Sequence, residues 1–241
     1  MNNILCTICM RGGSQGVKNK NIRSINGKPL MYYTIKQAIK SGIFNHIAIS
    51  TDSKKILNCA KSYGAKGWFM RPKRFSDNYS SKIPAIRHAL IKSEERYNKK
   101  FDLIVDLDVT SPLRKVEDII NAYKFFTKKK ADVLITGTKS RRNPYFNMVE
   151  IVKNKVRKVK IAKKKIYRRQ DAPQTFDMNA SIYIWNRKTL INSTNEIESL
   201  EKNTKSKTIF YEMPENRSLD IDSELDFKLV EFLLKDKNEK L

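Results

Sequence analysis

Apolar runs alternate with segments of helical spacing along the first 137 residues of the chain. Short apolar runs predict strands, and apolar residues three and four positions apart predict helices. The predicted strands are 4–10, 46–50, 66–70, 103–107 and 133–136, and the predicted helices are 30–40, 53–62, 83–97 and 116–127. This alternation predicts a Rossmann-like α/β fold, a mainly parallel sheet with helices on both faces. Such sheets bind ligands at the carboxyl ends of their strands.

The pattern changes after residue 137. Residues 139–176 alternate apolar and basic positions, which predicts a protruding β-ribbon rather than a core helix. A strand at 181–185, a polar loop at 192–207, an edge strand at 209–213 and a last helix at 223–234 complete the chain. We therefore expect one domain over residues 1–241, with 139–176 inserted as an arm.

The chain carries a strong positive charge. Its 241 residues contain 49 Lys and Arg against 25 Asp and Glu, a formal net charge of +24. Such a charge is compatible with nucleic acid or with an anionic substrate. Aromatic residues hardly interleave with the basic run 153–165, and no nucleic-acid-binding motif occurs. Nucleic-acid binding is therefore kept only as a remote alternative.

The cysteines and the apolar runs predict a cytoplasmic protein that has no contact with a membrane. No apolar stretch has the length needed to cross a bilayer, and the first apolar run leads into a glycine turn rather than a cleavage site. Three cysteines are too few, and odd in number, for a disulfide framework. Cys6 and Cys9 lie in a predicted strand and face opposite sides, so burial is favoured over metal binding.

A glycine turn with basic residues follows the first predicted strand. Gly12 and Gly13 allow backbone N–H groups to approach phosphate oxygens, and Arg11, Lys18 and Lys20 supply positive charge. The spacing matches neither a Walker A loop nor a dinucleotide fingerprint. An ordinary strand-to-helix turn is the alternative, and the three basic residues favour phosphate binding.

Polar residues also follow the predicted strand 103–107. Asp106 and Asp108 are two positions apart and therefore face the same side, a spacing that suits a metal or substrate hydroxyls. Thr110, Ser111 and Arg114 add hydrogen-bond donors. The alternative is that these residues only start the next helix.

Two further aspartates precede the last predicted helix. Asp220 and Asp222 alternate with apolar residues, so both carboxylates are expected on one side of an extended segment. Two carboxylates together with substrate phosphates are a common way to hold Mg²⁺. Helix capping by Ser223 and Asp226 is the alternative, but it leaves Asp220 unexplained.

Five stretches, in order along nearly the full chain, resemble the acylneuraminate cytidylyltransferase family, the CMP-sialic acid synthetases. They are RGGSQGVKNKNI from residue 11, STD from 50, RP with SDNYSS between 71 and 81, DVTSPLR from 108, and DIDSELD from 220. The loop 71–81 alone would be interpreted as a solvated loop that ends in a helix cap, Ser80 or Ser81. The pieces CTICMRGGS, RRNPYFN, DMNASIYIW and RSLDIDSELDFK are most similar to the CMP-legionaminic acid synthetases.

The resemblance implies a Mg²⁺-dependent reaction of CTP with a free acidic nine-carbon sugar, most similar to legionaminic acid, that yields the CMP-sugar and pyrophosphate. The alternatives are sialic acid or another acidic sugar, including a KDO-type or sugar-1-phosphate substrate. Such transfer needs positioning and electrostatics rather than a protein nucleophile. The resemblance also implies a homodimer, in which the arm helps to complete the sugar pocket of the partner.

The resemblance assigns roles to individual residues. Nucleotide contacts fall on Arg11, Gly12, Gly13, Ser14, Lys20, Asn21, Arg71 and Ser80. Sugar contacts fall on Asp108, Thr110, Ser111, Arg169, Gln170, Phe176 and Asn179. Metal ligands fall on Asp220 and Asp222, and Arg11, Lys20 and these two aspartates are the expected catalytic residues.

Two positions depart from the family pattern. Gln15 stands where the family loop has a lysine, so Lys18 is a candidate to replace that phosphate contact. Asp108 stands where the sialic acid enzymes have a glutamine, which we interpret as a mark of a different sugar.

Overall fold

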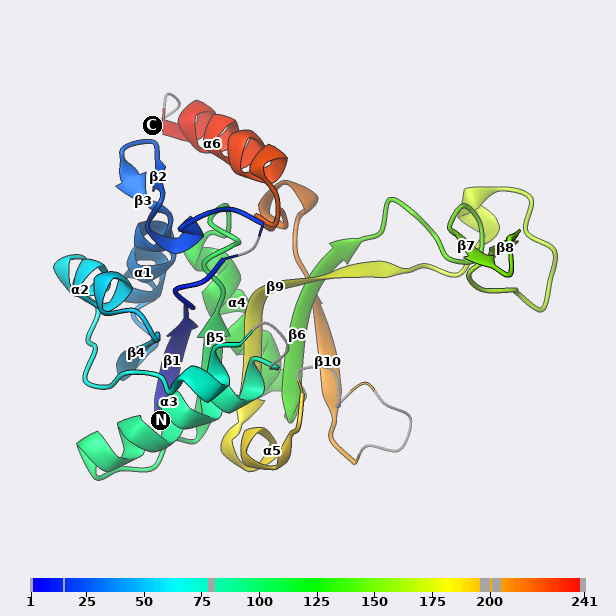
Figure 1. Ribbon diagram of the computed structural model, residues 1–241. Coiled ribbons are helices and arrows are strands. Elements are labelled where there is room, and N and C mark those ends of the chain that lie inside the picture. Colours follow the sequence, from blue (N-terminus) through cyan, green and yellow to red (C-terminus); the bar gives the residue numbers. More distant parts are fainter. Residues whose placement is uncertain (1, 15, 78–80, 196–199, 201–204, 239–241) are drawn as a thin grey trace.

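A six-stranded, mainly parallel sheet forms the centre of the molecule (Figure 1). The computed structural model describes residues 2–14, 16–77, 81–195, 200 and 205–238. The strand order is β10-β6-β9-β5-β1-β4, and only β9 runs antiparallel to its neighbours. The strands are β1 (Ile4–Cys9), β4 (His46–Ser50), β5 (Leu103–Leu107), β6 (Val133–Lys139), β9 (Phe176–Asn186) and β10 (Thr208–Glu212). The predicted fold class is confirmed.

Helices cover both faces of this sheet. One face packs against α1 (Leu30–Ser41), α2 (Lys54–Ser62), α4 (Val116–Lys129) and α6 (Glu224–Asn238), and the other against α3 (Ile83–Tyr97) and α5 (Arg187–Asn192). Successive strand residues alternate between the two cores, with Cys6 and Val105 on the first face and Leu5 and Ile104 on the second. Burial on both sides explains why the strands are continuous apolar runs.

Local signals in the sequence set the ends of the helices. Gly42 ends α1 in the left-handed conformation, at φ 66°. The Ser53 hydroxyl accepts a hydrogen bond from the Ile56 N–H and caps α2. None of the helices in the described part of the chain is long and apolar enough to cross a membrane.

The predicted strand at 66–70 is wrong. Lys66 forms a single bridge with Ala48 at the edge of the sheet, and no ladder follows. The next apolar residues turn toward α3, because the Trp68 indole N–H donates to the Lys92 carbonyl and the Phe69 ring packs against His88. Side-chain packing on a helix therefore replaces strand pairing here.

The sequence interpretation also missed two short elements. A hairpin of β2 (Ser24–Ile25) and β3 (Lys28–Pro29) turns through Asn26 and Gly27, which both have positive φ. Asn-Gly between short extended segments is a strong hairpin signal. Helix α5 was not predicted either, although Asn186 caps it by accepting a hydrogen bond from the Thr189 N–H.

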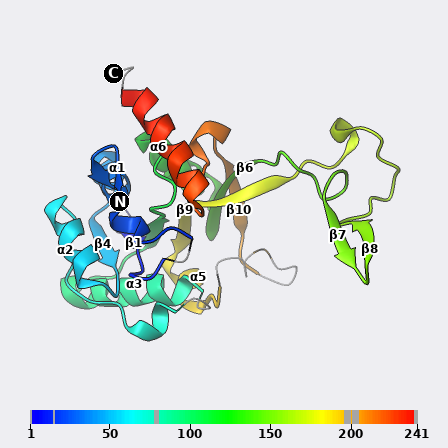
Figure 2. The same cartoon turned by 45° about the horizontal axis from the view of Figure 1, so that its top comes forward.

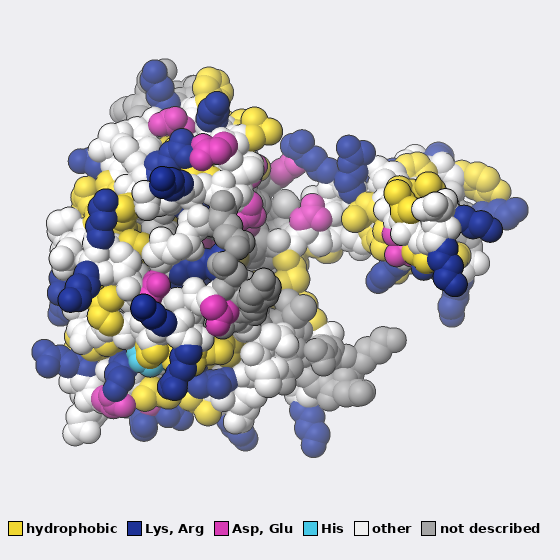
Figure 3. All heavy atoms as spheres, viewed as in Figure 1, with side chains coloured by type: hydrophobic (Ala, Val, Ile, Leu, Met, Phe, Trp, Pro, Cys, Tyr) yellow, Lys and Arg dark blue, Asp and Glu magenta, His cyan; other side chains and the backbone are white. Residues whose placement is uncertain are grey.

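The arm, residues 139–176, leaves the body between β6 and β9 (Figures 1 and 2). Its hairpin pairs β7 (Val149–Val152) with β8 (Lys155–Lys158), which confirms a ribbon over this part of the prediction. Ile151 and Val156 face each other and are 73% and 69% exposed. Figure 3 shows apolar and basic side chains mixed on the visible face of the arm. The arm therefore offers an apolar surface that its own chain does not cover.

Candidate nucleotide-binding site

A cleft opens at the carboxyl end of β1, where the chain order of the strands changes direction across the sheet. β4 and β5 flank β1, so the carboxyl ends of β1 and β5 border a topological switch point. A cavity of about 550 Å³ lies there, which we call the cleft. The predicted site residues that line it are Arg11, Ser14, Lys20, Asn21, Arg71, Asp108 and Thr110.

Polar contacts hold the glycine turn in place. The Gly12 N–H donates to an Asp52 carboxylate oxygen at 2.7 Å, which explains the role of the STD stretch. The Asn21 amide donates to the Arg11 carbonyl at 3.0 Å. No atom lies within 4 Å of the position that a Cβ at Gly13 would occupy. The turn therefore presents open backbone to the space beside it.

The late aspartate segment meets the glycine turn. The Lys20 ammonium donates to the Ile221 carbonyl at 2.6 Å and lies 3.7 Å from an Asp222 carboxylate oxygen. A Cβ at Gly16 would lie 1.9 Å from the Asp222 carbonyl oxygen, so only glycine permits this approach. The glycine turn and the segment that carries Asp222 therefore meet at Gly16 and Lys20.

The two aspartates have different surroundings. Asp220 accepts hydrogen bonds from the Ser111 hydroxyl and, at 3.4 Å, from the Ala180 N–H. Burial raises the pKa of Asp220, the Ser111 hydrogen bond opposes this shift, and the carboxylate of Asp108 adds to it. The Asp222 side chain, in contrast, is 84% exposed.

These carboxylates fit a divalent cation that is shared with a phosphate ligand. Among the described residues, no three acidic, histidine or cysteine side chains cluster closely enough to hold a metal ion. Mg²⁺ is usually bound through one or two carboxylates, with substrate phosphates and water as its other ligands. A cation beside Asp220 would also relieve the repulsion from Asp108 and Asp222 that raises its pKa.

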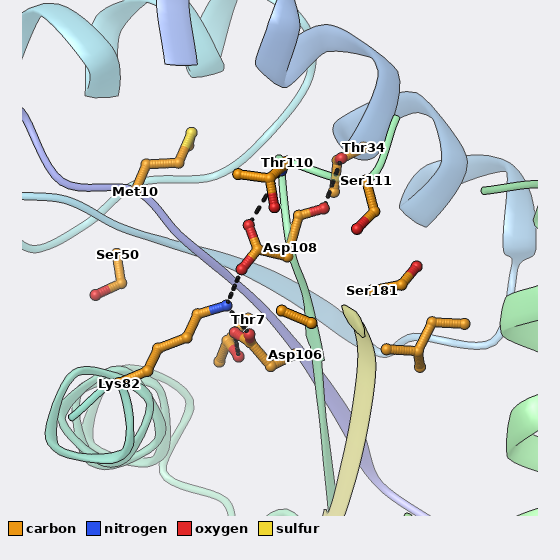
Figure 4. Close-up of polar contacts among 12 residues, drawn as sticks. Thr7, Met10, Thr34, Ser50, Lys82, Asp106, Asp108, Thr110, Ser111 and Ser181 are labelled. Carbon is orange, nitrogen blue, oxygen red and sulfur yellow. Dashed lines mark hydrogen bonds and ion pairs between the residues drawn. The ribbon is translucent and has the colours of Figure 1, made fainter. Parts of the chain in front are cut away.

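One lysine that lines the cleft, Lys82, is only 20% exposed (Figure 4). The Lys82 ammonium lies 2.5 Å from an Asp106 oxygen and 2.8 Å from an Asp108 oxygen, so the two aspartates do face one side. Burial alone would lower the pKa of Lys82, but Asp106 and Asp108 outweigh it and raise this pKa well above its usual value. Burial would raise the pKa of Asp108, and Lys82 with the Thr110 N–H lowers it to about 2. Lys82 and Asp108 are therefore in a position to stay ionised.

Lys82 was missed in the sequence interpretation. It stands immediately before α3, where a positive charge opposes the helix dipole. A lysine at the start of a helix therefore indicates, though weakly, that an acidic group elsewhere in the fold balances its charge. The compensating aspartates come from β5, which only the fold brings to this point.

Two buried arginines hold the walls of the cleft. Arg71 donates to the Met10 carbonyl at 2.8 Å, and to the carbonyl and hydroxyl of Ser50, so it joins the ends of β1 and β4. Arg114 donates to the Ser181 and Asp108 carbonyls, and burial lowers its pKa to about 10. The hydrogen bonds of both guanidinium groups to the backbone stabilise the strand ends.

Comparison with known proteins identifies the family. A family model described as Cytidylyltransferase matches residues 5–239. The chain belongs to the cytidylyltransferase family. Post-translational flagellin modification protein B of Campylobacter coli is 47% identical over 238 residues, 99% of this chain and 97% of that protein. CMP-N,N'-diacetyllegionaminic acid synthase of Campylobacter jejuni is 48% identical, with the same shares covered.

The fold is shared with a more distant enzyme. The solved structure of CMP:2-keto-3-deoxy-manno-octonic acid synthetase complexed with CTP superimposes with a TM-score of 0.66 at 16% identity. The superposition covers 98% of this cytidylyltransferase and 99% of that chain.

Four residues predicted to bind sugar lie away from the cleft of this cytidylyltransferase. Arg169 and Gln170 line a second cavity, of about 430 Å³, at the base of the arm. The Phe176 ring packs against Phe210 at a centroid distance of 4.7 Å. The buried Asn179 amide oxygen accepts a 2.6 Å hydrogen bond from the Thr136 hydroxyl. The structure therefore brings Asp108 and Thr110 to the cleft, but not these four.

The positions that remain from the sequence analysis are Ser111, Lys18, Ser80 and Gln15. Ser111 contacts Asp220 next to the cleft, whereas Lys18 is exposed and does not line it. Ser80 and Gln15 lie outside the described residues. The replacement of the family lysine by Lys18 stays a prediction.

Proposed function

We propose that this cytidylyltransferase joins CTP to a free nonulosonic acid of the legionaminic acid type, giving the CMP-sugar and pyrophosphate. The observation that carries the proposal is the contact of the basic glycine turn with the Asp220–Asp222 segment at the switch point. The high identity to a CMP-N,N'-diacetyllegionaminic acid synthase over the full length supports the choice of sugar. Sialic acid, or another acidic sugar, is the alternative.

The transfer needs no protein nucleophile. In the proposed reaction, the anomeric hydroxyl of the sugar attacks the α-phosphate of CTP in line, and pyrophosphate leaves. Lys20 and Arg11, both at the cleft, would neutralise phosphate charge. The Gly12 N–H is held by Asp52, and the open backbone at Gly13 would approach the phosphates. Positioning and electrostatics would then supply the catalysis.

Magnesium is the proposed cofactor. Asp220 and Asp222 would hold it, because Asp222 offers carboxylate oxygens next to Lys20 of the turn and Asp220 offers them beside Ser111 and Thr110. When bound, Mg²⁺ would neutralise negative charge on the triphosphate. The hydrogen bond from Ser111 would keep Asp220 oriented toward this position.

A homodimer built through the arm is part of the proposal. The hairpin exposes Val149, Ile151 and Val156, and within the described chain nothing covers them. Arg169 and Gln170 lie at the base of the arm and do not line the cleft of their own chain. They would therefore contribute to the sugar site of a partner chain. Replacing 149–158 by a short Gly-Ser linker should convert a dimer to a monomer in sedimentation velocity. A dimer that persists would contradict this part.

We also propose a cytoplasmic location. Cys6, Cys9 and Cys59 are all free thiols in the structure, as is usual in a reducing compartment.

Pyrophosphate release tests the proposed function. Purified protein would be incubated with CTP, Mg²⁺ and, separately, legionaminic, sialic, pseudaminic and KDO sugars. The proposal expects release with CTP, highest with the legionaminic acid type, and a CMP-sugar of the matching mass. Release with sialic acid alone would favour the alternative, and no release with any acidic sugar would contradict both.

A further inference from the structure

The position of Lys82 is electrostatically unfavourable for a lysine. Its side chain is only 20% exposed, and it stands at the positive end of α3. Burying an ammonium group is unfavourable without compensating charges and hydrogen bonds. Asp106 and Asp108 provide that compensation from a different element, β5 and the segment after it.

The two aspartates around Lys82 are not equivalent. Asp106 is fully buried, and one of its oxygens accepts a 2.7 Å hydrogen bond from the Thr7 hydroxyl, so it acts on the cleft only through Lys82. Asp108 lines the cleft. One Asp108 oxygen accepts from the Thr110 N–H at 3.1 Å and the other from Lys82 at 2.8 Å. These contacts fix the rotation of the Asp108 carboxylate (Figure 4).

An ionised carboxylate accepts hydrogen bonds and cannot donate them. It repels phosphate, so among the groups that the two substrates themselves present, its favourable partners are hydroxyl and N–H donors. We propose that Asp106 and Lys82 are positioning residues that hold Asp108 as a fixed acceptor, and that Asp108 selects the acceptor sugar through one of the sugar's hydroxyl or N–H donors. The inference rests on the proposed function.

The test compares variants whose charges stay balanced. Lys82→Met alone would leave two facing carboxylates without a cation and would endanger folding. The double variant Lys82→Met/Asp106→Asn removes one charge of each sign and keeps Asp108. Lys92→Met, an exposed lysine on the same helix, is the matched control. Thermal unfolding of each variant checks that it is folded.

The expected result is a separation of the two substrates. The double variant and Asp108→Asn should each raise the KM for the sugar about 10- to 100-fold, the scale of one hydrogen bond to a charged group. The KM for CTP should change less than about threefold. Adding the double change to Asp108→Asn should raise the sugar KM no further, because both positioning residues act through Asp108.

Three outcomes would overturn the inference. They are an unchanged sugar KM in the double variant, equal increases in both KM values, and additive effects in the triple variant. Additive effects would mean that Lys82 supports the fold rather than Asp108. The wild-type protein separates the two proposals, since failure to release pyrophosphate with any sugar removes the proposed function and this inference together. Normal wild-type activity with unchanged variants removes this inference alone.

Discussion

The Lys20 ammonium donates a 2.6 Å hydrogen bond to the carbonyl oxygen of Ile221, 201 residues later in the chain. The same nitrogen lies 3.7 Å from Asp222. One lysine therefore connects the turn after the first strand to the segment before the last helix. This contact places the ammonium group of Lys20, which lines the cleft, beside the carboxylate of Asp222.

Replacing Lys20 tests its role in charge neutralisation. Lys20→Met should lower kcat/KM about 100- to 1000-fold, because a positive group beside the phosphates is lost in the transition state. Lys28→Met, an exposed lysine of β3 that does not line the cleft, is the matched control, and we expect less than about a threefold change. Steady-state kinetics with saturating CTP measures both. Equal losses in the two variants would contradict the separate roles.

The close approach at Gly16 gives a second prediction. A Cβ there would overlap the Asp222 carbonyl, so Gly16→Ala must displace the aspartate segment. We expect a loss of about 1–3 kcal/mol in unfolding free energy and a lower kcat/KM. Gly13→Ala, which has open space around its Cβ position, is the control for stability. Denaturant unfolding that finds both variants equally stable would show that this contact does not constrain the segment.

Asp108 gives a prediction about selectivity. Asp108→Gln introduces the residue that the sialic acid enzymes carry, an amide that can donate as well as accept. We expect the ratio of kcat/KM for sialic acid to that for legionaminic acid to rise about tenfold or more. Competition between the two sugars, followed by mass analysis of the products, measures the ratio directly. An unchanged ratio would count against Asp108 as a determinant of sugar choice.

A buried ion pair away from the cleft predicts a pH dependence of stability. Burial raises the pKa of Glu94, but hydrogen bonds from Arg187 and Lys100 outweigh burial and lower this pKa to about 2. A lowered folded-state pKa stabilises the protein above the unfolded-state value and loses this contribution as the pH falls toward the folded-state value. Glu94→Gln should therefore cost about 1–3 kcal/mol at pH 7.

The difference between Glu94→Gln and the wild type should shrink as the pH falls from about 5 toward 2. Thermal unfolding over that range measures it. Glu95→Gln is the control, because Glu95 is 56% exposed and pairs with Lys92 on the same helix. A difference that stays constant with pH would contradict the assignment of the stabilisation to ionised Glu94.

Much of the fold was predictable because its strands are buried on both faces. Leu103–Leu107 and the first strand are apolar runs whose alternate residues enter two separate cores. The segment 66–70 has equal strand propensity, but Trp68 and Phe69 find aromatic and helical partners on α3. Strand propensity does not distinguish pairing in the sheet from packing on a helix, because both bury the same side chains.

The site was predictable where its residues lie in short motifs. The glycine turn and the pair Asp220 and Asp222 each have a local pattern with a chemical reason. Lys82 has none, because its partners are on a strand that follows its helix. Asn179 shows the opposite error. It lies in a motif and was predicted to bind sugar, but its side chain accepts a hydrogen bond from Thr136 inside the protein.

Magnesium dependence tests the central claim most directly. Equilibrium binding of CTP would be measured with and without Mg²⁺ for the wild type, for Asp220→Asn/Asp222→Asn and for Glu224→Gln, a 53% exposed carboxylate of α6 that pairs with Arg23. The account predicts that Mg²⁺ tightens CTP binding in the wild type and in Glu224→Gln, and that this gain falls at least about tenfold in the double variant. An undiminished Mg²⁺ effect in the double variant would contradict it.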